Sequence, residues 1–207
     1  MNTFWKNRSI NNFLLKNYDY FVNNVNCKYV WKCNEKNIHK MYKKNITKNH
    51  IEIGPGTGYF LKNYNFDNLT LIDVNDDILQ NSYDNLSKNA KNLNIINHDL
   101  FLKNNKLNNI NFESVGINYV LHCVPNTLDD SLKNLIYNLD SHNYKIFGST
   151  IIPPKNKVNI ASLELYFLNK YKIFNNLNHN ENQLINIKNN NIQLDKIGNN
   201  LLFQVDI

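Results

Sequence analysis

The sequence predicts an α/β fold built on a seven-stranded, mostly parallel sheet, with helices on both faces and an antiparallel last strand. Short segments that are apolar throughout, as in strands covered on both faces, alternate with segments of helical character. Near the end of the chain, two strand-like segments follow each other across a turn and break that alternation. A chain of 207 residues, 42% of them hydrophobic, has the size of one domain with a full core.

The first part of the chain is expected to form a helical cap over residues 1–48, and the domain core then spans residues 49–207. A second helix of this cap is expected over Glu35–Lys44. In the first helical segment, apolar side chains recur at near-helical spacing. They are Phe13, Leu14, Tyr18, Phe21, Val22 and Val25.

In the core, strands and helices are expected to alternate up to a closing hairpin. The expected strands are His50–Ile53, Leu69–Val74, Leu93–Asn97, Ser114–Leu121, Tyr144–Ile152, Ile192–Ile197 and Leu201–Ile207. The expected helices begin at about Gly58, cover Asp76–Asn89 behind an Asn75 cap, cover Leu128–Leu139, and lie near Ala161–Tyr171. The turn Gly198-Asn199-Asn200 joins the last two strands, so the final strand is predicted to pair antiparallel with its neighbours.

The charge pattern argues against a nucleic-acid partner despite a net charge of +6. The lysines are scattered singly, and the nearest approach to a cluster is Lys40, Lys43 and Lys44. Arg8 is the only arginine, so no arginine stripe is present for bidentate phosphate contacts. The excess of lysine is therefore interpreted as solvated surface.

The cysteines and the hydropathy pattern lead us to expect a cytoplasmic protein. Cys27, Cys33 and Cys123 match no zinc spacing, and an odd number gives no disulfide framework. No metal site is expected. The first residues lack the apolar segment of a signal peptide, and no run of 18 apolar residues predicts a membrane span.

The strongest functional indication is a glycine-rich bend that follows a strand and precedes an expected helix. It consists of Glu52, Ile53, Gly54, Pro55, Gly56, Thr57 and Gly58. Glycines let the backbone turn sharply and approach a ligand closely. The spacing is one residue shorter than that of a dinucleotide-binding loop, and the Glu52 carboxylate would repel a phosphate. It would attract an ammonium, as in S-adenosylmethionine (SAM), which carries no phosphate; a plain strand-to-helix turn is the alternative.

Two aspartates follow the next two strands. Asp73 lies about 20 residues after Gly54, where a carboxylate can bridge the two hydroxyls of a ribose. Asp99 follows the third strand, where it can accept the amino group of an adenine while apolar neighbours hold the ring. Each acid can alternatively cap a helix or a turn. Because the carboxyl ends of parallel strands share one edge of a sheet, we expect all three features to meet there.

In this order, the bend and the two aspartates resemble those of the class I, Rossmann-like SAM-dependent methyltransferases. The resemblance implies that Glu52 and the glycines hold the methionine part of SAM, that Asp73 holds the ribose and that Asp99 holds the adenine. The predicted cofactor-binding set is Trp31, Glu52, Gly54, Pro55, Gly56, Thr57, Gly58, Asp73, Val74, Asp99, Leu100 and Asn118. The demethylated product would be S-adenosylhomocysteine (SAH).

Further segments resemble a narrower group of small bacterial and fungal methyltransferases associated with secondary metabolism. They are Tyr29–Cys33, Asn118–Pro125, Phe147–Ile151, Tyr171–Asn175 and Leu201–Phe203, so the resemblance covers nearly the whole chain. The chain departs from the group before the fifth strand, where Ser141–Tyr144 replaces a glycine pair. That loop is expected to face away from the cofactor.

Five side chains are candidates for the acceptor side of the site. Tyr119 and His122 follow the fourth strand, and His122 could take a proton from a hydroxyl or an amine. The alternative is a histidine bonded to the backbone or to the cofactor. Trp31 is interpreted as a lid over the cofactor or as a core tryptophan, and Tyr18 and Asp19 are further candidates for the pocket.

The predicted function is methyl transfer from SAM to the oxygen, nitrogen or carbon of a small molecule, as a tailoring step on a natural product. An RNA methyltransferase and a non-catalytic SAM-binding scaffold are the alternatives. The chain lacks the Asn/Asp-Pro-Pro-aromatic motif of amino-methylating nucleic-acid enzymes, since Asn118 is followed by Tyr119-Val120-Leu121. A homodimer is left open, and an NAD(P)-dependent enzyme is disfavoured by Glu52 and the glycine spacing.

Overall fold

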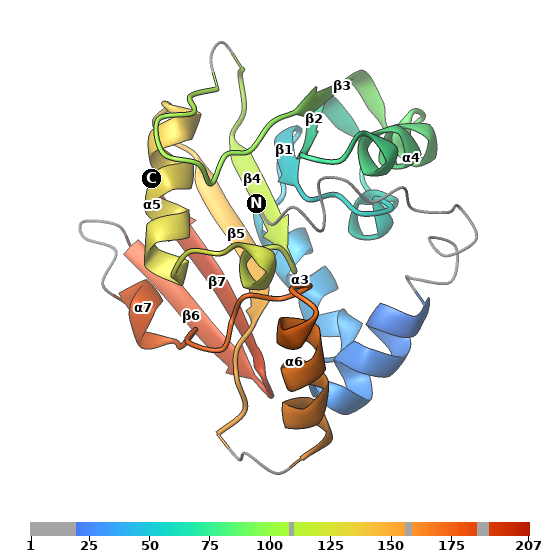
Figure 1. The fold of residues 1–207 in the computed structure, drawn as a ribbon. Coiled ribbons are helices and arrows are strands. Elements are labelled where there is room, and N and C mark those ends of the chain that lie inside the picture. Colours follow the sequence, from blue (N-terminus) through green and yellow to red (C-terminus); the bar gives the residue numbers. More distant parts are fainter. Residues whose placement is uncertain (1–19, 108–109, 156–158, 186–190) are drawn as a thin grey trace.

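The computed structural model describes residues 20–207 except 108–109, 156–158 and 186–190, and these form one mixed sheet with helices around it (Figure 1). The strand order is β3-β2-β1-β4-β5-β7-β6. The first five strands run parallel, whereas β7 pairs antiparallel with both β5 and β6. The predicted seven-stranded sheet and its antiparallel last strand are thus confirmed. The strands are β1 (Asn49–Ile53), β2 (Phe66–Asp73), β3 (Ala90–Asn97), β4 (Ser114–Asn118), β5 (Lys145–Ile151), β6 (Asn191–Ile197) and β7 (Asn200–Asp206).

Helical segments connect the strands, and four of them begin behind a polar cap residue: Asn34, Asn75, Thr127 or Asn159. Asn75 accepts hydrogen bonds from the backbone of Asp77 and Ile78, as expected of a helix cap. None of the helices within the described ranges is long and apolar enough to cross a membrane. The helices are η1 (Tyr20–Val30), α3 (Glu35–Asn45), η2 (Tyr59–Leu61), α4 (Asp76–Leu86), η3 (Leu121–Cys123), α5 (Leu128–Leu139), α6 (Ile160–Lys170) and α7 (Asn182–Ile185).

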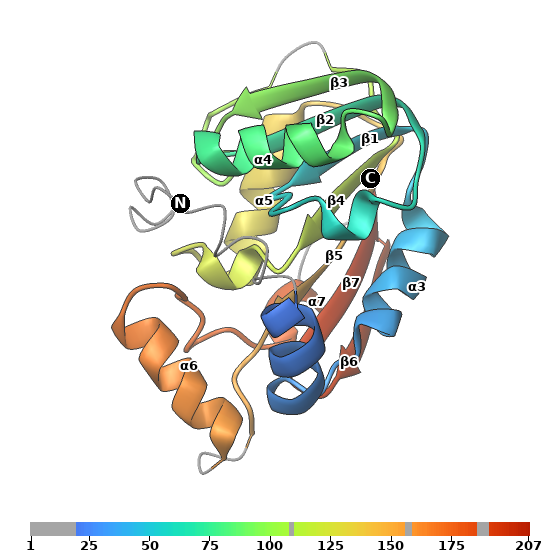
Figure 2. The same cartoon turned by 90° about the vertical axis from the view of Figure 1, so that its right-hand side faces the viewer.

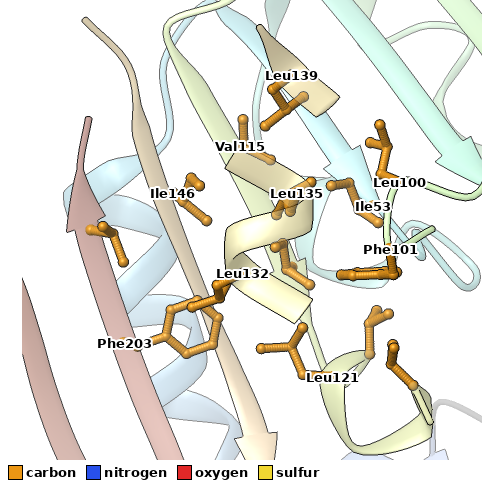
Figure 3. Packing of buried hydrophobic residues seen from close by; sticks show 14 of the residues in the cluster. Ile53, Leu100, Phe101, Val115, Leu121, Leu132, Leu135, Leu139, Ile146 and Phe203 are labelled. Carbon is orange, nitrogen blue, oxygen red and sulfur yellow. The ribbon is translucent and has the colours of Figure 1, made fainter. Parts of the chain in front are cut away.

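The larger part of the hydrophobic core lies between the sheet and α5 (Figure 3). Leu132, Leu135 and Leu139 recur at helical spacing on α5 and pack over Val115 of β4 and Ile146 of β5. Each of these side chains is almost completely buried. Burying a leucine, valine or isoleucine contributes roughly 1.5–3 kcal/mol, so this face fixes the sheet beneath the site.

The opposite face of the sheet is covered by α3 and α4 (Figure 2). Tyr42 of α3 packs edge-on against Phe147 of β5, with 5.0 Å between the ring centroids. Leu79 and Leu86 of α4 pack in the same cluster as Leu71 of β2. Helices therefore cover both faces, as the apolar strands predict.

A third cluster joins η1 to α6 beside the end of β5. Cys27 and Trp31 of η1 pack with Ala161 and Leu165 of α6 and with Ile151. The described part of the expected cap thus divides between two places: η1 lies against α6, whereas α3 packs on the sheet. The division into a cap over 1–48 and a core over 49–207 stays a prediction, and the apolar residues expected to form its first helix before residue 20 lie outside the described residues.

Two expected elements differ from the structure. The helix expected from Gly58 is a single turn, η2, because β2 begins at Phe66 rather than at Leu69 and leaves no room for more. The fourth strand ends at Asn118 instead of Leu121, because Tyr119 adopts a left-handed backbone with φ of 57°. The chain then turns into η3 and carries His122 toward the sheet edge.

Candidate functional site

A cavity of about 330 Å³ lies where the carboxyl ends of the parallel strands meet η1 and α6. This edge is where ligands of open α/β sheets bind. Six of the predicted site residues line it together: Trp31, Gly54, Gly56, Asp73, Tyr119 and His122. The cavity wall also contains Asn26, Cys27, Ile78, Val120, Cys123, Ile151, Glu164, Leu168, Ile173 and Phe174.

The glycine bend forms one wall of the cavity, and each of its glycines has a left-handed backbone. The φ angles of Gly54, Gly56 and Gly58 are 66°, 58° and 75°. A Cβ at Gly54 would lie 2.4 Å from Cγ2 of Val120, and one at Gly58 would lie 2.7 Å from Cδ1 of Leu86. A Cβ at Gly56 would meet nothing within 4 Å, so the space beside Gly56 is left for a ligand.

Glu52 does not line the cavity, so the expected contact of its carboxylate with the ammonium of SAM stays a prediction. Strand alternation directs its side chain to the α3 face, where it is 3% exposed. Tyr42 donates its hydroxyl to Oε1 at 2.5 Å, and Nε2 of His50 lies 2.9 Å from Oε2. Gly116 on β4 provides the room, since a Cβ there would lie 2.1 Å from Oε2. Glu52 therefore ties β1 to α3 beneath the bend.

Asp73 ends β2 with a buried carboxylate that faces the cavity. Its Oδ1 accepts the backbone N–H of Asn75 at 2.9 Å. Burial raises the pKa of this carboxyl to about 6, despite the backbone N–H donors of Asn75 and Val74, and the nearby Asp99 carboxylate adds to the rise. At neutral pH the ionised Asp73 is thus a poorly solvated acceptor at the sheet edge, and hydroxyl donors from a ligand would relieve it.

The remaining predicted cofactor residues do not line the cavity. Asp99 accepts the backbone N–H of Phe101 at 3.0 Å. Leu100 is buried in the α5 core cluster, and Val74 is also buried. Asn118 accepts the hydroxyl of Ser149 across the β4–β5 pair. Pro55, Thr57 and Gly58 of the bend also do not line the cavity. The roles predicted for all of these stay predictions.

Trp31 is predicted from the sequence to be either a lid over the cofactor or a core residue. It lines the cavity and is also only 2% exposed, so its position fits both interpretations. Its ring centroid lies 6.3 Å from that of Phe174. Its backbone carbonyl accepts the N–H of Asn199 at 2.9 Å and the side-chain amide of Asn200 at 3.1 Å. The β6–β7 hairpin thus holds this wall of the cavity in place.

His122 is held as a neutral ring. Burial lowers its pKa to about 3, and Nδ1 accepts the backbone N–H of Ile151 at 3.4 Å. The ring proton is therefore carried by Nε2, and this nitrogen is a donor. This geometry supports the alternative interpretation, a histidine bonded to the backbone, over a proton acceptor.

Tyr119 is likewise a donor. Burial raises the pKa of its phenol well above the usual value, so the hydroxyl stays protonated at neutral pH. Its backbone N–H donates to Ser149 at 2.9 Å, which fixes the left-handed turn after β4. Tyr18 and Asp19, the other expected pocket residues, lie outside the described residues.

The sequence interpretation missed the wall that α6 and its flanking loop contribute. Glu164, Leu168 and Phe174 come from this region, and Asn26 comes from η1. One signal was available: Glu164 is the only acid in α6, within the otherwise apolar segment Leu163–Leu168. Local periodicity predicts that α6 is a helix, but it does not predict that α6 packs against η1, because the two are distant in sequence.

The donor set of the cavity fits a SAM-type ligand. One buried carboxylate faces a glycine bend with open space beside Gly56, and the rest of the wall is mostly apolar. Such a wall suits a nucleoside with a short amino-acid arm. Across the described ranges, no group of three or more His, Cys, Asp or Glu side chains is arranged to hold a metal ion.

Comparison with known proteins identifies relatives that are named methyltransferases. The chain is 30% identical to the methyltransferase aurB of Calcarisporium arbuscula over 183 residues, covering 78% of this chain and 77% of that protein. It is 29% identical to the demethylluteothin O-methyltransferase of Streptomyces thioluteus over 175 residues, covering 81% of this chain and 74% of that one. No family model matches the chain.

Among solved structures, the fold is similar to that of the N-methyltransferase NodS of Bradyrhizobium japonicum in complex with SAH. The TM-score is 0.52 at 13% sequence identity, and the match covers 83% of this chain and 86% of that one. At this identity the likeness shows the fold. It agrees with the strand order described above.

Proposed function

Since the chain belongs to the class I SAM-dependent methyltransferases, we propose that it methylates a hydroxyl of a small natural-product molecule. SAM is the methyl donor. The observation that carries the proposal is the meeting of the Gly54–Gly58 bend and the buried Asp73 carboxylate at one cavity. A relative named as an O-methyltransferase supports oxygen as the atom methylated.

The chain's own residues would hold the donor through two contacts. The ionised Asp73 would accept the ribose hydroxyls, because its burial leaves the carboxylate in need of donors. The bend would lie against the methionine part, with Gly56 leaving the space. When bound, SAM supplies a methyl group on a positively charged sulfur, whose departure as a neutral thioether needs no acid.

Alignment of the acceptor is then the main task of the protein. Holding two reactants in line can supply about 7–11 kcal/mol of the barrier. Trp31, Phe174 and Ile151 form an apolar wall that excludes water and fits a flat, apolar acceptor. An RNA substrate is not favoured by the relatives, and homodimer formation stays a prediction from the sequence.

Calorimetric titration with SAM and SAH tests the proposal. Wild-type protein should bind both, and Asp73→Ala should lower the affinity by at least roughly a hundredfold, because a charge-assisted pair of hydrogen bonds is lost. The matched control is Asp84→Ala, which removes an exposed carboxylate on α4 and should bind like wild type. Unchanged affinity in Asp73→Ala would remove the ribose assignment.

Transfer of a labelled methyl group to a panel of hydroxylated natural products then separates an enzyme from a scaffold. A scaffold would bind SAM and transfer no label to any acceptor. An RNA enzyme would label RNA, and its affinity for RNA would fall steeply with salt. Labelling of small hydroxylated acceptors alone supports the proposed function.

A further inference from the structure

The acceptor side of the cavity contains one carboxylate, Glu164. This residue is partly buried on α6 and lines the cavity together with Leu168, which lies one turn further along the same face. Ala161 and Leu165 of α6 pack in one cluster with Trp31 and Cys27. An acid on the inner face of an apolar helix is costly unless it has a partner.

Asn26 of η1 is that partner. Its side-chain amide donates to Oε1 of Glu164 at 2.8 Å and so joins two elements that are distant in sequence. Among the described residues, this is the only hydrogen bond that the Glu164 side chain makes, which leaves Oε2 without a partner from that part of the chain. The hydrogen bond to Oε1 thus orients the carboxylate, and Oε2 is available to accept a hydrogen bond from a ligand.

Three ionisable groups that line the cavity with Glu164 are neutral at physiological pH. From η1, burial raises the pKa of the Cys27 thiol to about 12. From the loop after β4, Tyr119 is held protonated, and from η3, His122 is held neutral with its proton on Nε2. Burial also raises the pKa of Glu164 itself above its ordinary value. Of these groups, Glu164 is the carboxylate, the side chain best suited to accept a proton.

We propose that Glu164, positioned by Asn26, accepts the proton of the acceptor's hydroxyl, and that this hydroxyl is an acidic one, a phenol or an enol on a flat apolar ring. The assignment rests on the proposed function. A carboxylate is too weak a base for an alkyl alcohol and is suited to a hydroxyl that readily gives up its proton. Tyr119 and His122 are then donors that orient the acceptor.

The step balances with these groups alone. The acceptor oxygen forms a bond to the methyl carbon while the carbon–sulfur bond of SAM breaks, and the electron pair of that bond goes to sulfur. The hydroxyl proton goes to Glu164, which later releases it to solvent through its partly exposed side. The products are a methyl ether and SAH.

Binding of 2-naphthol and of its methyl ether, 2-methoxynaphthalene, in the presence of SAH tests the assignment without turnover. Wild-type protein should bind 2-naphthol at least roughly tenfold more tightly than the ether, because only the naphthol can donate to the carboxylate. Glu164→Gln should reduce that preference to about twofold or less. Glu113→Gln, an exposed site with the same charge change, should keep it.

Three binding results would overturn the assignment: a wild-type protein that binds both compounds equally, a Glu164→Gln variant that keeps the preference, or binding of neither compound at millimolar concentration. Failure of the proposed function looks different. In that case wild-type protein would not bind SAM and SAH, or it would bind SAM and transfer no label to any small hydroxylated acceptor, whatever its preference between naphthol and ether. The two hypotheses are therefore tested separately.

Kinetics on 2-naphthol adds a readout that a structural role would not change. Glu164→Gln should lower kcat by roughly 10²–10⁴-fold while SAM affinity stays within about twofold. Asn26→Ala removes a donor to the carboxylate, so the acid limb of the pH–rate profile should move to higher pH. An unmoved limb in Asn26→Ala, or a Glu164→Gln enzyme with wild-type kcat, would contradict the assignment.

Discussion

The charges at this site are set residue by residue through burial. Asp73 and His122 are both forced toward their neutral forms, since burial raises the pKa of the acid to about 6 and lowers that of the imidazole to about 3. For His122 this makes the neutral ring a weak base at physiological pH. For Asp73, burial means that the ionised carboxylate destabilises the ligand-free protein. Hydrogen-bond donors from a ligand can offset this loss of stability.

Asp73→Asn should therefore stabilise the free protein at neutral pH. A folded-state pKa of about 6 against 3.8 in the unfolded chain corresponds to a cost of about 3 kcal/mol when the carboxyl is ionised in both states. The cost is fully present above pH 6 and is lost as the pH falls to 3.8 and below, because the carboxyl is then protonated in both the folded and the unfolded state. The asparagine oxygen can still accept the Asn75 N–H.

Urea unfolding of Asp73→Asn and wild type between pH 4 and pH 8 measures this effect. The variant should be more stable at pH 8, by up to about 3 kcal/mol, and the two proteins should converge toward pH 4. A variant that is less stable at pH 8 would show that the carboxylate is satisfied within the free protein.

At the scale of the element, the glycine bend has two separate requirements, packing and ligand space. Gly54 lies against Val120, so its missing side chain serves the contact between the bend and the loop after β4. Gly56 faces the cavity and needs only its left-handed backbone. Glu52 fixes the strand that leads into the bend through Tyr42 and His50.

Alanine at these two glycines should separate stability from binding. Gly54→Ala should cost at least about 2 kcal/mol of unfolding free energy, because overpacking against Val120 adds to backbone strain. Gly56→Ala should cost about 1 kcal/mol, from the positive φ alone. Thermal unfolding and SAH titration measure both. We expect Gly56→Ala to lose more SAH affinity than Gly54→Ala although it loses less unfolding free energy. Equal losses of affinity and of stability in the two variants would contradict the separate roles of the two glycines.

At the scale of the whole molecule, the sequence predicts what local periodicity and turn chemistry determine. The seven strands and the hairpin at Gly198 depend on neighbouring residues, and the structure confirms them. The direction of Glu52 could not be predicted, because it depends on Tyr42 from another element and on room left by Gly116 of β4. The position of Glu164 in the cavity could not be predicted either, because its partner Asn26 is distant in the chain. Contacts between elements, which no local pattern encodes, shape the acceptor side.

Ligand binding at the site should stabilise the whole fold. A ligand that binds only the folded chain at a hundred times its Kd stabilises it by about 2.7 kcal/mol, which for a chain of this length raises Tm by roughly 5–10 °C. SAH should produce this shift at pH 7.5. At pH 5 the Asp73 carboxyl is mostly protonated, so SAH affinity should fall about tenfold and the shift should shrink by roughly half at the same ligand concentration.

Differential scanning calorimetry at both pH values, with Asp73→Ala and Asp84→Ala alongside, measures this coupling. Asp73→Ala should show little shift at either pH, and Asp84→Ala should behave like wild type. A wild-type shift of equal size at pH 5 and pH 7.5 would mean that SAH is held without the ionised carboxylate. Asp73 would then have a structural role only. A carboxylate that does not contact the ligand cannot make this edge of the sheet selective for a nucleoside.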